Sequence, residues 1–140
     1  MAESLLVDSS CLLAAIDEGE QDHLQVQAFL KSDRRPLLVT DYIIAEVDYL
    51  VLKRLGSKAE QAFIQQIIEG IFMRESVLNI DLERALEIVE KYSDHEIGIT
   101  DATLMALSER KQIQEILTLD HRHFSVFRDR HGRKLKLLPA

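Results

Sequence analysis

The sequence predicts an α/β domain with a mostly parallel central sheet. Short apolar runs recur at residues 4–7, 37–39 and 115–119, and segments with helical spacing of apolar residues lie between them. Runs of this kind are typical of strands that are buried on both faces. Strands that alternate with helices pair in parallel through crossover connections, which gives the predicted class.

The composition is that of a globular protein of 140 residues, with 46% hydrophobic and 29% charged residues. This length suits one domain with a substantial core, so we expect residues 1–140 to form a single domain. The single cysteine, Cys11, excludes an internal disulfide and is consistent with a reducing compartment. No apolar run approaches the roughly 18–20 residues of a membrane span, and residues 1–4 lack the basic opening of a signal peptide. A cytoplasmic protein without a membrane partner is expected.

Charge is unevenly distributed along the chain. Residues 1–121 have a net charge of −12, whereas residues 122–140 have a net charge of +5. A protein that is acidic overall is not an obvious nucleic-acid binder. A basic C-terminal segment beside an acidic site would nevertheless suit a metal-dependent enzyme that acts on phosphates. The alternative is a solvated tail.

Aspartates follow two of the predicted strands. Asp8 comes directly after the first apolar run and Asp120 directly after the run 115–119. The carboxyl ends of strands are where open α/β sheets bind ligands, although Asp8 could instead cap the helix that follows it. A phosphatase of the haloacid-dehalogenase type does not fit, because it needs a second aspartate where this chain has Ser10. A response-regulator receiver does not fit either, because it needs an upstream acidic pair.

A long helix is predicted over residues 42–55, with Thr40 or Asp41 as its cap. It is apolar nearly all round, so we expect burial on more than one side and hypothesise that part of it meets a second subunit. Glu46 and Asp48 interrupt it and point about 200° apart around the helix axis, so they cannot both face one cleft. Their neighbours are similarly apolar, and spacing alone does not choose between them.

The remaining elements are predicted from caps and periodicity. The stretch 97–110 reads as a helix that is entered through a Gly turn, with Thr100 as the N-cap and Asp101 at the first helical position. Asp101 then shares an inward face with Leu104 and Met105. The other predicted elements are helices over 22–31, 57–69 and from Asp81 onward, a short strand around 76–78, and an edge strand over 135–139.

Four carboxylates can therefore converge at one edge of the sheet. Asp8 and Asp120 end strands, and Asp101 and Glu46 lie early in helices that follow strands or turns. Clustered carboxylates raise each other's pKa in the absence of a cation, and a hard divalent ion such as Mg²⁺ relieves this repulsion. Such ions activate water and stabilise the leaving oxygen in phosphodiester hydrolysis.

Other chemistries have less support in the sequence. The chain has no Walker-type lysine loop, no GxGxxG motif and no credible Ser-His-Asp set. The pair His121 and His123 could bind zinc, but a zinc site needs further ligands and Cys11 is an unsuitable one. The role of the two histidines stays open, and metal-assisted hydrolysis is the leading prediction.

Several motifs, taken in order, resemble the PIN-domain ribonucleases and, within them, the VapC-type toxins of bacterial toxin–antitoxin pairs. The motifs are Asp8-Ser9-Ser10, Glu46 in the long helix, Gly98-Ile99-Thr100-Asp101-Ala102, and Thr118-Leu119-Asp120 with His123-Phe124. The resemblance covers essentially the full length. It implies a single PIN domain with a three-layer α/β/α sandwich and a Mg²⁺- or Mn²⁺-dependent endoribonuclease. It also implies a homodimer that is inhibited by a cognate VapB-like antitoxin.

The resemblance also implies roles for particular residues. Asp8 and Asp101 would be the main metal ligands. Glu46 and Asp120 would complete the catalytic and metal-binding acids and help to orient the attacking water. The resemblance selects Glu46 over Asp48, which spacing could not do.

Supporting residues are expected around these acids. The hydroxyls of Ser9 and Thr118 would hydrogen-bond the carboxylates. Relatives in the family cut tRNA or ribosomal RNA at particular loops, where RNA sequence is usually read. Six C-terminal cations are hypothesised to contact RNA phosphates: Arg122, Arg128, Arg130, Arg133, Lys134 and Lys136.

Two rival functions remain at this stage. One is a non-catalytic PIN-like binding module, whose acidic pocket receives a basic segment of a partner. The other is a phosphatase or a DNA-directed nuclease that uses the same metals. Comparing RNA, DNA and a phosphomonoester as substrates would separate these possibilities.

Overall fold

The computed structural model describes residues 4–139, and these form a five-stranded sheet in which every neighbouring pair of strands is parallel. The prediction of an α/β fold with a mostly parallel sheet is confirmed. The strands, in the order in which they lie in the sheet, are β3 (Met73–Arg74), β2 (Leu37–Val39), β1 (Leu5–Val7), β4 (Glu115–Leu117) and β5 (Lys136–Leu138). The helices are α1 (Ser9–Ile16), α2 (His23–Ser32), α3 (Asp41–Leu55), α4 (Ser57–Ile68), α5 (Asn79–Lys91), the 3₁₀ helix η1 (Ser93–His95), α6 (Ile99–Lys111) and α7 (His121–Val126).

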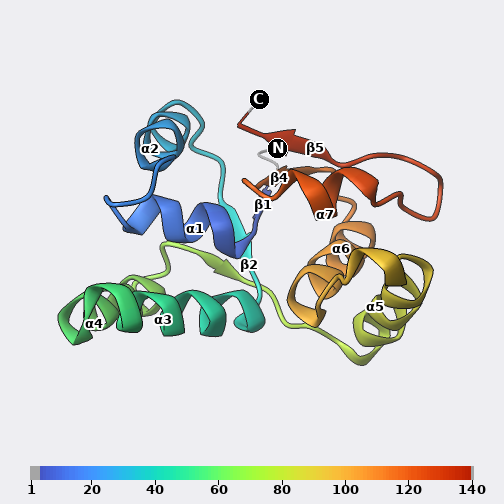
Figure 1. Cartoon of the computed structure of the whole chain (residues 1–140), viewed down its shortest axis with the longest axis horizontal. Helices are drawn as coiled ribbons and strands as arrows, with labels where there is room; N and C mark the ends of the chain where they lie inside the picture. The colour runs from blue at the N-terminus through green and yellow to red at the C-terminus, as the bar shows by residue number, and fades with distance from the viewer. Residues whose placement is uncertain (1–3, 140) are drawn as a thin grey trace.

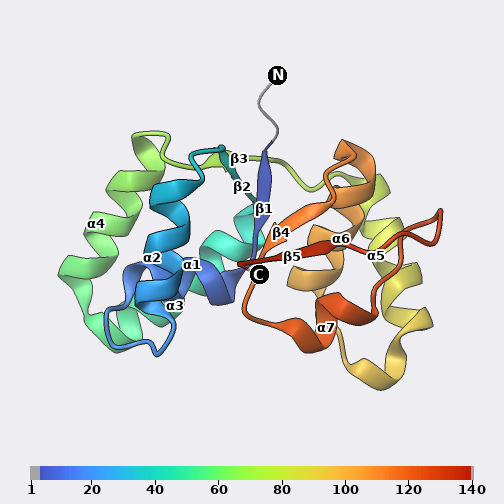
Figure 2. The same cartoon turned by 90° about the horizontal axis from the view of Figure 1, so that it is seen from above.

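Helices cover both faces of the sheet. Figures 1 and 2 show α1 to α4 on one side of the strands and α5 to α7 on the other, which makes three layers. From β1 the chain moves outward to β2 and β3, and from β4 it moves outward in the opposite direction to β5. The topological switch therefore lies between β1 and β4, and open sheets of this kind form a crevice at that point, outside the carboxyl ends of the strands.

The core explains why the central strands are apolar throughout. All three residues of β1 are buried, because helices pack on both of its faces. Cys11, Phe124 and Phe127 are also buried. Across the described residues 4–139, none of the helices combines the length and the apolar character that crossing a membrane would need.

Three predicted element boundaries were wrong, among them the start of α5, which is Asn79 rather than Asp81. The third strand is Met73–Arg74 rather than residues 76–78, which instead lead into α5. There the Asp81 carboxylate accepts a hydrogen bond from the Leu78 N–H at 2.8 Å, so it closes the first turn of α5 from inside the helix. Helix α6 begins at Ile99 with Gly98 as its N-cap, so Thr100 is not the cap and Asp101 is the third helical residue.

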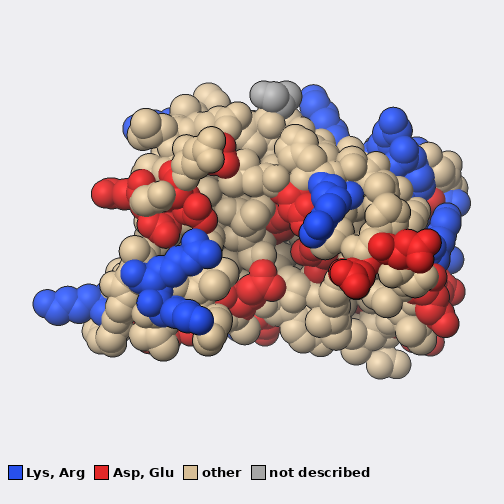
Figure 3. Space-filling model, in the orientation of Figure 1, with Lys and Arg blue, Asp and Glu red and all other residues tan. Residues whose placement is uncertain are grey.

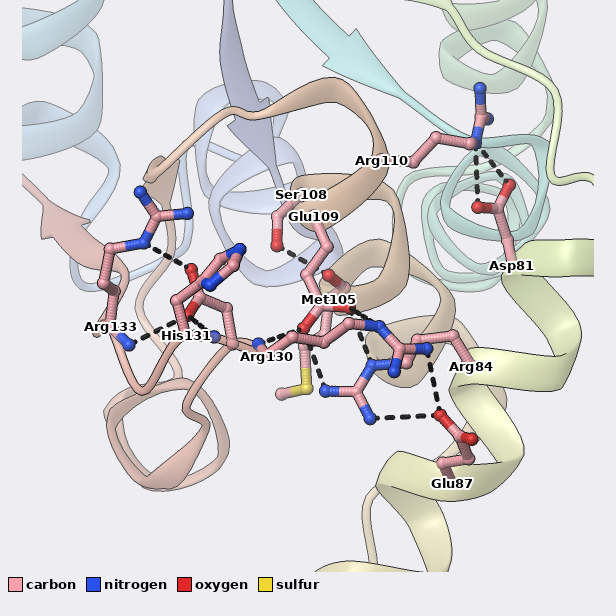
Figure 4. A network of polar contacts seen from close by, with 11 residues as sticks. Asp81, Arg84, Glu87, Met105, Ser108, Glu109, Arg110, Arg130, His131 and Arg133 are labelled. Atoms are coloured by element: carbon pink, nitrogen blue, oxygen red, sulfur yellow. Dashed lines mark hydrogen bonds and ion pairs between the residues drawn. The ribbon is translucent and has the colours of Figure 1, made fainter.

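A network of ion pairs ties α5, α6 and the segment after α7 together (Figure 4). The Glu109 carboxylate accepts from Arg84 Nε at 2.7 Å and Nη2 at 2.9 Å, which makes the pair bidentate. Glu109 also accepts from the backbone N–H of Arg130 at 3.0 Å. The side chains of Glu109 and Arg84 are only 12% and 15% exposed. The carboxylate therefore joins three segments in a site with little solvent.

Replacing Glu109 with alanine is expected to lower the free energy of unfolding by about 2 kcal/mol, because Arg84 would lose its bidentate partner while partly buried. Glu87→Ala is the matched control, since Glu87 also bonds Arg84 but its side chain is 56% exposed. That control is expected to change the free energy by less than about 0.5 kcal/mol. Urea denaturation measures both variants, and equal destabilisation would contradict the assignment.

Candidate metal centre at the carboxyl edge of the sheet

A polar pocket of about 370 Å³ lies at the switch point between β1 and β4. Figure 1 shows the beginnings of α1, α3, α6 and α7 converging there. In the same orientation, Figure 3 shows acidic side chains around the hollow between the two groups of helices. The pocket is lined by Asp8, Ser9, Ser10, Glu46, Gly98, Ile99, Thr100, Asp101 and Asp120. The four predicted acids are thus brought together from four separate segments.

Asp8 lies at the bottom of this pocket and is only 2% exposed. Its Oδ2 accepts from the Thr118 hydroxyl at 2.5 Å, and its Oδ1 accepts from the Ser10 hydroxyl at 2.7 Å. Oδ1 also accepts from the Cys11 N–H at 3.1 Å, so Asp8 caps α1 as well as facing the pocket. Burial raises the pKa of Asp8 to about 6, against the opposing effect of these hydrogen bonds.

Glu46 reaches the pocket from α3. Its Oε1 accepts a hydrogen bond from the Ser9 hydroxyl, which aims the carboxylate toward the start of α1. Asp48 does not line the pocket. It faces α4 instead, where the neighbouring Asp48 carboxylate raises the pKa of the half-buried Glu60. The structure therefore shows that Glu46, and not Asp48, faces the pocket, a choice that the spacing in the sequence could not make.

Asp101 and Asp120 both face the same nitrogen of one imidazole. His123 Nδ1 is 3.2 Å from Asp101 Oδ2 and 3.1 Å from Asp120 Oδ2. Asp120 also caps α7, where its Oδ1 accepts from the His123 N–H at 3.2 Å. Ligand atoms of the three residues all lie within 4.8 Å of one another, a spacing that could hold a metal ion.

Burial is the main cause of the raised pKa values of Asp8 and Asp101. The pKa of Asp101 is raised first by burial, then by the charges of Asp120 and Glu46, while His123 lowers it. For Asp8 the charge of Asp101 is the smallest contribution. Both pKa values are raised, as expected for clustered carboxylates. The expected cause was mutual repulsion, whereas burial is the larger cause in the structure.

The donor set fits a hard divalent cation. Every acid in the pocket offers carboxylate oxygens, which are the ligands that Mg²⁺ and Mn²⁺ take in proteins. Burial raises the pKa values of Asp8 and Asp101, and among the described residues neither acid forms an ion pair with a lysine or an arginine. A divalent cation would supply that charge. The residues that could hold it are Asp8, Glu46, Asp101 and Asp120.

The six C-terminal cations that are predicted to contact RNA do not line this pocket. Only Arg122 belongs to an element, α7, that starts at the pocket. After α7 the chain must return to the amino edge of the sheet, because β5 is parallel to β4. Arg133, Lys134 and Lys136 therefore line a groove with Gln112 and Glu115 at the opposite edge. The remaining two are held elsewhere: Arg128 donates to carbonyls at the end of α7, and Arg130 joins the Glu109 network.

Sequence reasoning missed one residue and left another without a role. The Ser10 hydroxyl donates to Asp8 and accepts from the Leu119 N–H at 3.0 Å, so it links the ends of β1 and β4. The available signal was a second serine directly after Asp8. His123 was named as a possible zinc ligand and as part of a family motif, with its role left open, although its position three residues after a capping aspartate predicts that it faces that aspartate.

The sequence matches known proteins over nearly its whole length. A model of the PIN domain family matches residues 5–129. The chain is 38% identical over 135 residues to Ribonuclease VapC26 of Mycobacterium tuberculosis (strain ATCC 25618 / H37Rv), which covers 96% of this chain and 100% of that protein. The family match spans the positions of all four acids of the pocket.

Solved structures share the fold. The crystal structure of VapC20 from Mycobacterium tuberculosis superposes with a TM-score of 0.80 at 21% identity, covering 86% of this chain and 93% of that one. VapBC2 from Rickettsia felis gives a TM-score of 0.68 at 13% identity, covering 96% and 97%. With the family match and the relative at 38% identity, these findings show that the chain belongs to the PIN-domain family and groups with its VapC-type ribonucleases.

Proposed function

We propose that this protein is a Mg²⁺- or Mn²⁺-dependent endoribonuclease toxin that hydrolyses RNA phosphodiester bonds by attack of water. The observation that carries the proposal is the convergence of four carboxylates from four segments in one pocket at the switch point. Its full-length relative is named a ribonuclease, which supports RNA as the substrate class. The acids of the pocket are the groups such chemistry needs.

We assign the following roles. Asp8 and Asp101 are the main ligands for the cation, and Glu46 and Asp120 complete the acidic site and orient the attacking water. When bound, the cation would activate water and neutralise charge that develops on the phosphate. The Thr118 hydroxyl holds Asp8, in a contact of 2.5 Å, and keeps that carboxylate facing the pocket. The Ser9 hydroxyl does the same for Glu46.

The proposed substrates are loops of tRNA or ribosomal RNA. Single-stranded loops expose bases and phosphates that a shallow site can reach. VapC20, which shares this fold, is described as a toxin that cleaves the Sarcin-Ricin loop. Intact ribosomes and total tRNA are therefore the two substrates to compare first.

The proposed protein partners are a cognate VapB-like antitoxin and a second copy of this chain. Structural neighbours include VapBC assemblies and a toxin–antitoxin complex from Klebsiella pneumoniae, which supports the first. A basic side chain of the antitoxin could enter the acidic pocket in place of the cation.

The second copy of this chain is proposed to pack against α3. The apolar side chains Tyr49 and Leu52 of this helix are 59% and 43% exposed, which supports a homodimer. Light scattering at micromolar concentration tests dimerisation, and a strictly monomeric protein would contradict it.

The test is cleavage of total RNA and intact ribosomes by antitoxin-free protein, with Mg²⁺, Mn²⁺ or EDTA. Discrete fragments that require the metal would support the proposal. Fragments that persist in EDTA would point to a contaminating nuclease. Folded, metal-loaded protein that cuts no RNA would favour a non-catalytic module whose pocket receives a basic partner segment.

Arg122 is proposed to contact an RNA phosphate beside the acids, because α7 begins at the pocket and this side chain is exposed. Arg122→Gln is expected to weaken RNA binding and to reduce the slope of log affinity against log salt by about 1. Lys134→Gln removes the same charge at the opposite edge and serves as the control. Equal effects of the two substitutions in a salt titration would contradict a local role for Arg122.

A further inference from the structure

His123, in α7, contacts two acids of the pocket, Asp101 and Asp120. Its ring Nδ1 faces Asp101 Oδ2 and Asp120 Oδ2 at nearly equal distances, 3.2 Å and 3.1 Å. Its backbone N–H donates to the other oxygen of Asp120. One residue therefore contacts both oxygens of Asp120 and the nearer oxygen of Asp101. The two acids come from separate elements, and His123 is the side chain that joins them.

The surroundings of the ring decide which nitrogen has the proton. Two carboxylate oxygens face Nδ1, and carboxylates only accept hydrogen bonds, so Nδ1 must be a donor. Nε2 is buried and has no hydrogen-bond partner among residues 4–139. A proton on Nε2 would leave a donor unsatisfied there, which is costly for a buried group. The neutral ring with its proton on Nδ1 meets both conditions.

We propose that His123 is a positioning residue for the metal centre. Its Nδ1–H donates to Asp101 Oδ2 and lies beside Asp120 Oδ2, so it holds the two carboxylates together on the side away from the cation. The other oxygen of Asp101 is thereby left for the cation. This inference rests on the proposed function, because His123 would position two of the carboxylates that are proposed to bind the cation. Hydrogen bonds that orient ligating carboxylates in this way contribute to metal affinity as well as to activity.

The test is the affinity of the full chain for Mn²⁺, measured by electron paramagnetic resonance of the free ion. His123→Leu keeps the branching at Cγ but has no donor, and it is expected to weaken Mn²⁺ binding roughly 10- to 100-fold. His123→Asn places an amide nitrogen where Nδ1 lies, and it is expected to recover most of that affinity. His123→Gln places its amide one bond farther out, so it should remain weak. His121→Leu, at an exposed position two residues away, is the control and should bind as the wild type does.

The outcomes separate this inference from the proposed function. Wild-type affinity in His123→Leu, or an Asn variant as weak as the Gln variant, would overturn the positioning role. A nitrogen directly bound to Mn²⁺, detected by pulsed electron paramagnetic resonance, would also overturn it, because His123 would then be a ligand. If the wild-type protein itself bound no Mn²⁺, the proposed function would fail first. Thermal melting of the metal-free variants shows whether each one is folded.

Discussion

Replacing Asp101 with asparagine is expected to lower the rate of RNA cleavage at least about a thousandfold. The substitution removes a carboxylate proposed to bind the cation, and the cation is worth several kcal/mol of transition-state stabilisation. The fold should survive, because asparagine has nearly the same shape and can still accept a hydrogen bond from His123 Nδ1. Single-turnover cleavage of a defined RNA loop measures the effect without interference from product release.

Asp94→Asn is the matched control for this experiment. Asp94 is an exposed acid in η1 outside the pocket, so the substitution makes the same change of charge without touching the site. Cleavage by the control should stay within about twofold of the wild type, as expected for an exposed surface position. A large loss in both variants would show that overall charge, rather than a ligand at Asp101, governs the rate.

Replacing Asp8 with asparagine is expected to have opposite effects on stability and on cleavage. Burial raises the pKa of Asp8 to about 6 in the folded protein from 3.8 in the unfolded chain. The protonated Asp8 carboxyl therefore contributes fully to the free energy of unfolding below about pH 4. This contribution is lost as the pH rises through 6 and the buried carboxyl ionises. Asparagine does not ionise, so the metal-free variant should unfold with a free energy about 1–3 kcal/mol larger than the wild type at pH 8. Cleavage should be lost.

Urea denaturation in EDTA at a series of pH values checks this prediction. The stability difference between Asp8→Asn and the wild type should grow between pH 4 and pH 7 and then level off. Adding Mn²⁺ should stabilise the wild type more than the variant, because a ligand stabilises the state that binds it. A variant that is less stable than the wild type at pH 8 would mean that the Thr118 and Ser10 hydrogen bonds outweigh the burial of the charge.

The order of elements and the place of the site were predictable from the sequence. Buried strands such as Leu5–Val7 are continuous apolar runs, and the aspartates that follow β1 and β4 must lie at one edge of a parallel sheet. Cap positions were less predictable. At Gly98 the backbone takes an extended N-cap conformation without a side-chain bond, so Thr100 offered a false signal. The two-residue strand β3 is exposed at the sheet edge and leaves almost no apolar pattern.

Contacts between distant segments could not be predicted from local patterns. Glu46 and Asp48 have similar neighbours along α3, and only the packing of α1 and α4 against that helix distinguishes them. The same holds for the basic C-terminal segment, because its position depends on the return of the chain to the amino edge before β5. The charge asymmetry of the sequence was real, but it did not say which edge of the sheet received the cations.

The most direct test of the account is anomalous diffraction from crystals of the protein grown with Mn²⁺. The central claim is that the four carboxylates at the switch point form a metal centre. We predict an anomalous peak in contact with Asp8 and Asp101, beside Glu46 and Asp120, and its loss in Asp101→Asn. A peak at another site, or an empty pocket in protein that still cleaves RNA with Mn²⁺, would contradict the claim.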